Sequence, residues 1–185
     1  MFNFASLYFL RGKNGFTLIE LAVVMLLFIL TAAFAVPNVA KVIPRYRLKE
    51  ASRGIYSDLQ LAKLTAVKEG TPCTVEFTST GYQIFIDVNE NLERDGVETG
   101  NQYLLKQVNW SDYKDVELDT SNGGGDGLSF MDNDNGNPAI SFLPTGLTIN
   151  NIGGLGVGTV FLRLKNDTSK QMRVVVNSTA SIRIE

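Results

Sequence analysis

An apolar run that begins at Phe16 and reaches Val36 constrains this chain more than any other feature of its sequence. As a helix, the run would extend about 30 Å, which matches the hydrocarbon thickness of a bilayer. A single carboxylate, Glu20, lies inside it, behind a short basic leader that contains Arg11 and Lys13. A charged side chain within a bilayer costs roughly 2.5–3.5 kcal/mol, so an intramembrane acid indicates a function. A secretory signal peptide or a plain membrane anchor would explain the run but not the acid.

The residues around that acid carry a recognisable signature. Gly15-Phe16-Thr17-Leu18-Ile19-Glu20 resembles the processing site of type IV pilins and type II secretion pseudopilins. In that family a prepilin peptidase cuts after the glycine, and the new N-terminal residue is N-methylated. The resemblance implies that residues 1–15 are a cleaved leader, that cleavage falls between Gly15 and Phe16, and that Phe16 is methylated.

Cleavage would place two opposite charges close together. The new α-amine of Phe16 lies one helical turn from Glu20, on nearly the same face. In a bundle of such helices, Glu20 of one subunit can pair with the Phe16 amine of a neighbour. The pair would offset the desolvation of both groups and fix the axial register between subunits. We therefore expect Phe16 and Glu20 to carry assembly.

Composition excludes several classes of function. The 185 residues suffice for one long helix and one modest domain. The formal net charge is −2, and loss of the basic leader makes the chain more acidic, which does not favour nonspecific nucleic-acid binding. The chain has no histidine, the commonest general base and metal ligand, so we predict that it is not an enzyme. Cys73 is the only cysteine, which rules out an intrachain disulfide.

Residues 37–70 continue the helix with an amphipathic pattern. Apolar residues recur at three- or four-residue spacing and predict a face that lies on a sheet. These residues are Leu48, Ala51, Ile55, Leu59, Ala62 and Ala66. Gly70-Thr71-Pro72 ends the helix.

The pattern of residues 71–185 indicates β-structure. Strands are expected at 73–78 and 82–87, in a late hairpin of 160–165 with 172–176 around a turn at 166–169, and at 181–185. Weaker candidates are 103–108, 128–131, 139–143 and 147–149. We predict an α+β, pilin-like fold. A long N-terminal helix, with a membrane-spanning half at 16–36 and an amphipathic half at 37–70, packs on a small antiparallel β-sandwich domain at 71–185.

Three later segments resemble one branch of the family, the pseudopilin H and FimT/FimU-type minor pilins. They are the helical residues 59–68, the strand 82–87 with its acidic loop, and the turn Phe142-Leu143-Pro144-Thr145-Gly146. The resemblance implies a minor pseudopilin or minor pilin, a structural subunit with a tip or initiation role in a type II secretion pseudopilus or a type IV pilus. Secretion, motility and DNA uptake stay open as alternatives.

The same resemblance implies a location and a set of partners. The subunit would sit in the bacterial inner membrane as a single-pass protein, with its globular domain in the periplasm, and then enter the filament. Its partners would be other pilins or pseudopilins, the prepilin peptidase, the inner-membrane assembly platform, the lipid bilayer and exported cargo.

An acidic loop follows the strand at 82–87. Oxygen-bearing side chains occupy positions 1, 3, 5, 7, 9 and 12 of a calcium-type loop. They are Asp87, Asn89, Asn91, Glu93, Asp95 and Glu98. However, Leu92 replaces the turn glycine at position 6, and a solvated, Asx-rich connection explains the same residues without a metal. Ca²⁺ is the alternative to that plainer interpretation, and no other cofactor is predicted. A second run, 132–137, has a similar composition without the terminal acid.

Basic residues gather near the C-terminus and raise one further alternative. Some FimT-like minor pilins serve DNA uptake, and Arg163, Lys165 and Arg173 lie in the late hairpin. Arg163 and Lys165 would share one face of a strand because they are two residues apart. Charge alternation on a solvent-facing hairpin explains them equally well, and the acidic net charge favours that interpretation. A DNA-binding minor pilin of a competence pilus is therefore the alternative function, and nucleic acid is not an expected partner.

Overall fold

The computed structural model describes residues 15–98 and 100–185, and the side chains of all of these except 34–41. Residues 1–14 of the predicted leader lie outside the described part. The chain forms two compact units, Met1–Lys41 and Val42–Glu185. The helix α1 (Leu18–Glu69) has 52 residues and contributes to both units, so it runs through Pro37 and Pro44 without a break.

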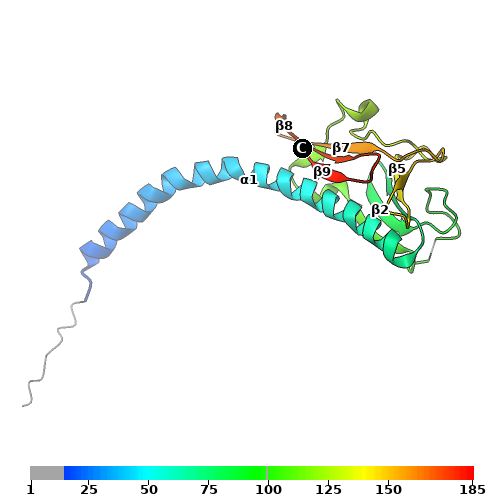
Figure 1. Cartoon of the computed structure of the whole chain (residues 1–185). Helices are drawn as coiled ribbons and strands as arrows, with labels where there is room; N and C mark the ends of the chain where they lie inside the picture. The colour runs from blue at the N-terminus through cyan, green and yellow to red at the C-terminus, as the bar shows by residue number, and fades with distance from the viewer. Residues whose placement is uncertain (1–14, 99) are drawn as a thin grey trace, which may run out of the picture. The chain divides into compact units, whose positions relative to one another are not determined.

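The strands all lie in the second unit, where they form two antiparallel sheets (Figure 1). The first sheet has the order β3-β2-β1-β5-β6, and the second has the order β4-β7-β8-β9. The first contains β1 (Cys73–Phe77), β2 (Gly81–Ile86), β3 (Leu104–Asn109), β5 (Ala139–Phe142) and β6 (Thr148–Ile149). The second contains β4 (Val116–Leu118), β7 (Gly158–Leu164), β8 (Asp167–Val176) and β9 (Ile182–Ile184). Two short 3-10 turns, η1 (Trp110–Asp112) and η2 (Gly123–Gly125), lie between strands of different sheets.

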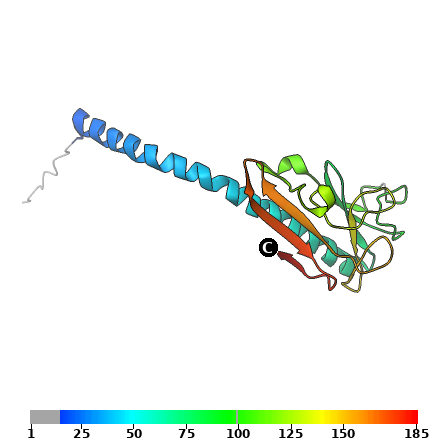
Figure 2. The same ribbon diagram turned by 90° about the horizontal axis from the view of Figure 1, so that it is seen from above.

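The second half of α1 supplies one wall of the core. The apolar stripe predicted from the sequence, from Leu48 to Ala66, is buried in one cluster with residues of both sheets. Two views show this half of the helix lying along the strands (Figures 1 and 2). Ala62 and Ala66 are fully buried, and their small side chains allow the helix backbone to approach the sheets closely. The predicted α+β, pilin-like architecture is confirmed.

Aromatic side chains fill the region where the two sheets meet. The ring of Phe77 in β1 stacks on Phe130, with a centroid distance of 5.0 Å, and on Trp110, at 6.4 Å. Phe130 follows Leu128, whose backbone bridges to Val160 in the second sheet. The segment at 127–131 thus joins the sheets both through its aromatic side chain and through backbone bonds, from Ser129 to Thr159 in β7 and from Ala139 in β5 to Met131.

Two local predictions need correction, and the sequence pattern missed one strand. Residues 128–131 form no strand and make only the single bridge at Leu128, because glycine turns before them and the 132–137 turn after them leave too few residues for a ladder. The turn of the late hairpin consists of residues 165–166, and β8 already begins at Asp167. The strand β4 was not predicted, since three residues are too short for a recognisable alternation.

Candidate functional site

The N-terminal motif lies at the start of α1. Gly15 and Phe16 precede the first helical residue and are exposed, with Phe16 at 84%. Thr17 and Glu20 form a reciprocal cap: the backbone N–H of Glu20 donates to Thr17 Oγ1 at 3.2 Å, and that of Thr17 donates to Glu20 Oε2 at 3.3 Å. This is the capping box that Thr-x-x-Glu signals, and the sequence interpretation overlooked it. Glu20 therefore has a local role in starting the helix.

The first turns of α1 expose apolar side chains around the whole helix. Every described side chain from residue 15 to residue 33 is exposed, including Leu18 at 85% and Phe28 at 67%. A helix that is apolar on all faces needs apolar surroundings, either lipid or other helices. Among the described residues, no helix meets the length and apolarity that crossing a membrane requires. Residues 34–36 of the predicted membrane segment lie outside the described side chains.

The acidic loop begins at a buried carboxylate that closes the loop on itself. Asp87 is fully buried, and its Oδ2 accepts hydrogen bonds from Thr74 Oγ1 at 2.7 Å and from the backbone N–H of Leu92 at 3.0 Å. Its Oδ1 accepts from the backbone N–H of Asn91 at 3.3 Å. Burial raises the pKa of Asp87, and these bonds oppose that rise. Both oxygens are thus occupied by donors from the protein.

Four of the other predicted calcium ligands gather farther along the loop. Asn89 Nδ2 and Asn91 Nδ2 donate to Asp95 Oδ2 at 3.1 and 3.0 Å. Glu98 is fully buried, and its Oε1 accepts from the backbone N–H groups of Val88 and Asn89. The structure therefore brings together Asn89, Asn91, Asp95 and Glu98.

The pKa values of the two acids in this group, Asp95 and Glu98, shift in opposite directions. The backbone N–H of Val97 is the main cause that lowers the pKa of Asp95 from its ordinary value. Burial is the main cause that raises the pKa of Glu98, and contact with the Asp95 carboxyl raises it further. Glu93, the remaining predicted ligand, has a buried Oε1 that meets no hydrogen-bond partner among residues 15–98 and 100–185. In the part of the chain that the structure describes, no three Asp, Glu, His or Cys side chains form a metal-binding group.

The second Asn-rich run has a structural role in the fold. Asn133 Nδ2 and Asn137 Nδ2 donate to the buried Glu76 Oε1 at 3.0 and 2.9 Å. Asn133 Nδ2 also donates to the backbone carbonyl of Leu92 at 3.1 Å. The run at 132–137 therefore fastens the acidic loop to β1.

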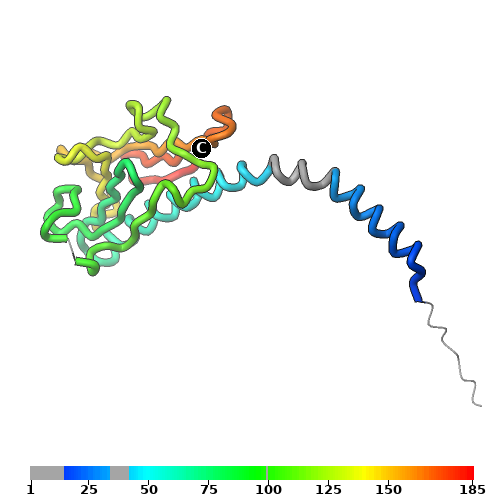
Figure 3. Tube along the Cα trace, turned by 180° about the vertical axis from the view of Figure 1, so that it is seen from behind, coloured from blue at the N-terminus to red at the C-terminus, as the bar shows by residue number. Residues whose placement is uncertain are grey.

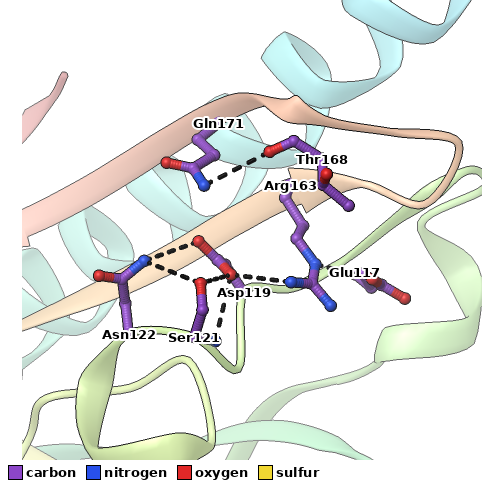
Figure 4. Close-up of polar contacts among 7 residues, drawn as sticks. All are labelled: Glu117, Asp119, Ser121, Asn122, Arg163, Thr168 and Gln171. Atoms are coloured by element: carbon purple, nitrogen blue, oxygen red, sulfur yellow. Dashed lines mark hydrogen bonds and ion pairs between the residues drawn. The ribbon is translucent and has the colours of Figure 1, made fainter.

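Two of the three predicted nucleic-acid ligands have carboxylate partners. Arg163 lies between Glu117, at 2.8 Å from its Nε, and Asp119, at 3.1 Å from its Nη1 (Figure 4). Hydrogen bonding to Glu117 is the main cause that raises the pKa of Arg163. Arg173 pairs with Glu185 at 2.7 Å, and Lys165 is exposed. Carboxylates at these distances offset the positive charge that a nucleic-acid surface needs, so the geometry does not favour one.

The fold and the site together define a class of protein. A long N-terminal helix that exposes apolar residues in its first turns and packs its second half on antiparallel sheets is the architecture of a pilin-like subunit. The family model of the type II transport protein GspH matches residues 51–180, and the chain belongs to this family. A model of the prokaryotic N-terminal methylation motif matches residues 10–36.

One solved structure with a similar fold is the minor pseudopilin EpsH from the type 2 secretion system of Vibrio cholerae. The match has a TM-score of 0.49 and 14% sequence identity, and it covers 75% of this chain and 96% of that one. No curated protein sequence matches the chain.

Family membership confirms the resemblance to pseudopilin H and the minor pseudopilin function inferred from it. The family is structural rather than enzymatic and is associated with the inner membrane and the pseudopilus. Its methylation motif implies processing by a prepilin peptidase and assembly with other pilin-like subunits. Nothing in the described residues favours the DNA-binding alternative.

Proposed function

We propose that the chain is cut between Gly15 and Phe16 and then assembles through α1 into a type II secretion pseudopilus. The observation that carries this proposal is the order of two matches on one chain, the methylation motif at 10–36 followed by the GspH model at 51–180. The first supplies the processing signal, and the second assigns the remainder to a transport family. The exposed positions of Gly15 and Phe16 are consistent with access by a peptidase.

Before assembly, residues 16–36 anchor the subunit in the inner membrane as a single pass, and the globular unit faces the periplasm. The exposed apolar side chains between Leu18 and Leu30 support this location, because water does not solvate such a surface well. During assembly the lipid around these side chains is replaced by the helices of other pseudopilins. The inner-membrane platform that drives this exchange and the exported cargo are the further partners.

Glu20 sets the register of each new subunit. Cleavage removes the peptide bond before Phe16 and leaves a charged amine within one turn of the Glu20 carboxylate. Inside an apolar bundle either charge alone is costly, so Glu20 pairs with the Phe16 amine of a neighbouring subunit. The carboxylate lies in the first turn of the helix, where it also accepts bonds from the Thr17 backbone N–H and hydroxyl.

The test is deletion of the gene, with complementation by the wild-type chain. Exoprotein release, surface motility and natural transformation are measured side by side in the same strains. We expect loss of exoprotein release alone, restored by the wild-type gene. Loss of motility or DNA uptake while secretion continues would overturn the proposal and make the chain a pilus subunit.

A further inference from the structure

Glu98 carries a buried oxygen that has no partner in the described part of the chain. The residue is 0% exposed. Its Oε1 accepts two backbone hydrogen bonds, but among the described residues its Oε2 is buried and meets no donor. Burying a charged oxygen without a partner is costly, so such an atom in a native fold calls for a specific explanation.

The Asp95 carboxyl group lies on the same side of the loop as Glu98. Asn89 joins the two acids, because its backbone N–H donates to Glu98 Oε1 at 3.4 Å and its Nδ2 donates to Asp95 Oδ2 at 3.1 Å. Neither carboxylate can donate, and two like charges bound to one residue repel, so a cation shared between them would offset that repulsion. One proton neutralises only one of the two charges, whereas a divalent cation neutralises both. Arg94 directs its Nε to the backbone carbonyl of Glu98, at 3.2 Å.

Two neutral oxygens are available beside the acid pair. The side-chain amides of Asn89 and Asn91 both contact Asp95 Oδ2. A half-turn of either amide exchanges its nitrogen for its oxygen at the same place. Carboxylate and amide oxygens are the ligands that Ca²⁺ takes in proteins, and the four residues occupy positions 3, 5, 9 and 12 of the calcium-type spacing.

The backbone of the loop has the bend that this spacing requires. Leu92, at the position where calcium loops carry glycine, has φ of 60°. That left-handed conformation is uncommon for leucine, and here the buried side chain and the bond from its N–H to Asp87 hold it. Leu92 therefore replaces the glycine of the calcium-type sequence pattern but keeps a left-handed backbone at that position.

We propose that the loop from Asp87 to Glu98 binds Ca²⁺ through the carboxylates of Asp95 and Glu98 and the side-chain oxygens of Asn89 and Asn91. Asp87 is not a ligand in this site, because donors from the protein occupy both of its oxygens. Waters complete the coordination shell. The inference is independent of the proposed function, since it rests on the globular unit alone.

Calcium suits this group of oxygens better than magnesium does. Mg²⁺ requires near-octahedral geometry and gives up its waters reluctantly, whereas Ca²⁺ accepts six to eight oxygens in a flexible arrangement. The loop lies at one end of the compact unit (Figure 3), where Asn133 fastens the backbone of Leu92 to the neighbouring turn. Calcium would thus stabilise this end of the domain.

Calorimetry on the full chain tests the site. The protein is purified in detergent, freed of metal with a chelator and titrated with CaCl₂ or MgCl₂ near pH 7.5. We expect calcium binding with a Kd on the order of 10⁻⁴–10⁻³ M, the range of extracellular calcium modules, and magnesium binding at least about tenfold weaker. At a calcium concentration of about ten times Kd, the Tm followed by Trp110 fluorescence should rise by about 3–8 °C.

Variants of the loop identify the ligands. Glu98→Gln keeps the shape of the side chain but removes one ligand charge, so calcium affinity should fall at least about tenfold. Glu90→Gln is the matched control, because it removes one charge from an exposed side chain of the same loop, and it should bind like the wild type. Asp95→Asn serves as the second variant if Glu98→Gln does not fold, as judged from Trp110 emission.

Two results would overturn the proposal. One is the absence of calcium binding and of any Tm shift in the wild-type chain at about 10 mM calcium, well above the expected Kd. The other is wild-type affinity in the folded Glu98→Gln or Asp95→Asn chain. In either case the loop is an ordinary Asx-rich connection without a metal.

Discussion

At the scale of single residues, Asp119 shows how this protein accommodates a buried charge. Its carboxylate is 1% exposed and accepts hydrogen bonds from Ser121 Oγ at 2.5 Å, Asn122 Nδ2 at 2.7 Å and Arg163 Nη1 at 3.1 Å (Figure 4). The Ser121 hydroxyl is the main cause that lowers the pKa of Asp119, and Asn122 and Arg163 lower it further. The charge is stabilised by donors from two separate places in the chain, residues 121–122 and Arg163.

We predict that Asp119→Asn lowers the free energy of unfolding by about 2 kcal/mol near pH 7, because the donors on Ser121, Asn122 and Arg163 lose their charged acceptor. A carboxyl whose pKa is lower in the folded state stabilises the fold above its unfolded pKa, and that stabilisation is lost as pH falls through the folded pKa. The difference between variant and wild type should therefore shrink below about pH 3.8. Urea unfolding of the wild type and the variant, monitored by Trp110 fluorescence near pH 7 and again below about pH 3.8, measures this difference.

The control for this prediction is Glu50→Gln, which removes an exposed carboxylate from α1. A surface charge contributes little, so its effect should stay within about 0.5 kcal/mol at either pH. An Asp119→Asn chain as stable as the wild type near pH 7 would show that Arg163 and Asn122 find other partners at no cost.

At the scale of elements, the contact between α1 and the sheets depends on small side chains. Ala62 is fully buried, whereas Leu64 on the same helix is 66% exposed. Ala62→Leu forces a larger side chain into a packed interface, and we predict a loss of about 1–3 kcal/mol in the free energy of unfolding. Leu64→Ala is the matched control and should change it by no more than about 0.5 kcal/mol. Thermal or urea unfolding of both variants tests the contact, and equal stabilities would contradict it.

The elements with strong periodic patterns could be predicted from the sequence. The stripe from Leu48 to Ala66 repeats over several turns, and the late hairpin alternates clearly along β7, so both were found. The short elements were not: β4 has three residues, and the hairpin turn at residues 165–166 was placed too far along the chain. Such details depend on pairing between strands, which a single strand's pattern does not contain.

The candidate sites also differ in how far the sequence alone could predict them. The processing motif and the spacing of the acidic loop are local, so the sequence alone revealed both. The partners of Arg163 are not local, because Glu117 and Asp119 lie 46 and 44 residues away in the chain. The Glu98 oxygen that has no partner among the described residues could not be predicted either, since it results from how the loop folds back on its own start at Val88 and Asn89. The Thr17–Glu20 cap is also local, and its Thr-x-x-Glu spacing is sufficient to predict it.

At the scale of the whole molecule, Glu20 has two roles that must be separated. It caps α1 through Thr17, and in the proposed filament it pairs with the Phe16 amine of a neighbour. Glutamine can replace glutamate in a capping box, because its amide oxygen still accepts the backbone bond, but it cannot form the ion pair. Alanine removes both interactions. The two substitutions at one position therefore distinguish a defect in helix initiation from a defect in subunit pairing.

We predict that Glu20→Gln and Glu20→Ala both reduce incorporation into the filament by about tenfold or more, because each leaves the Phe16 amine unpaired in an apolar bundle. Leader cleavage should proceed normally in both variants, and the change in electrophoretic mobility measures it. Thr17→Ala is the control, since it removes the side-chain cap but keeps the charge, and it should assemble like the wild type. Filaments sheared from cells that overproduce the subunits are quantified by immunoblot. Wild-type incorporation of Glu20→Gln together with failure of Thr17→Ala would assign the role of this acid to helix capping instead of pairing.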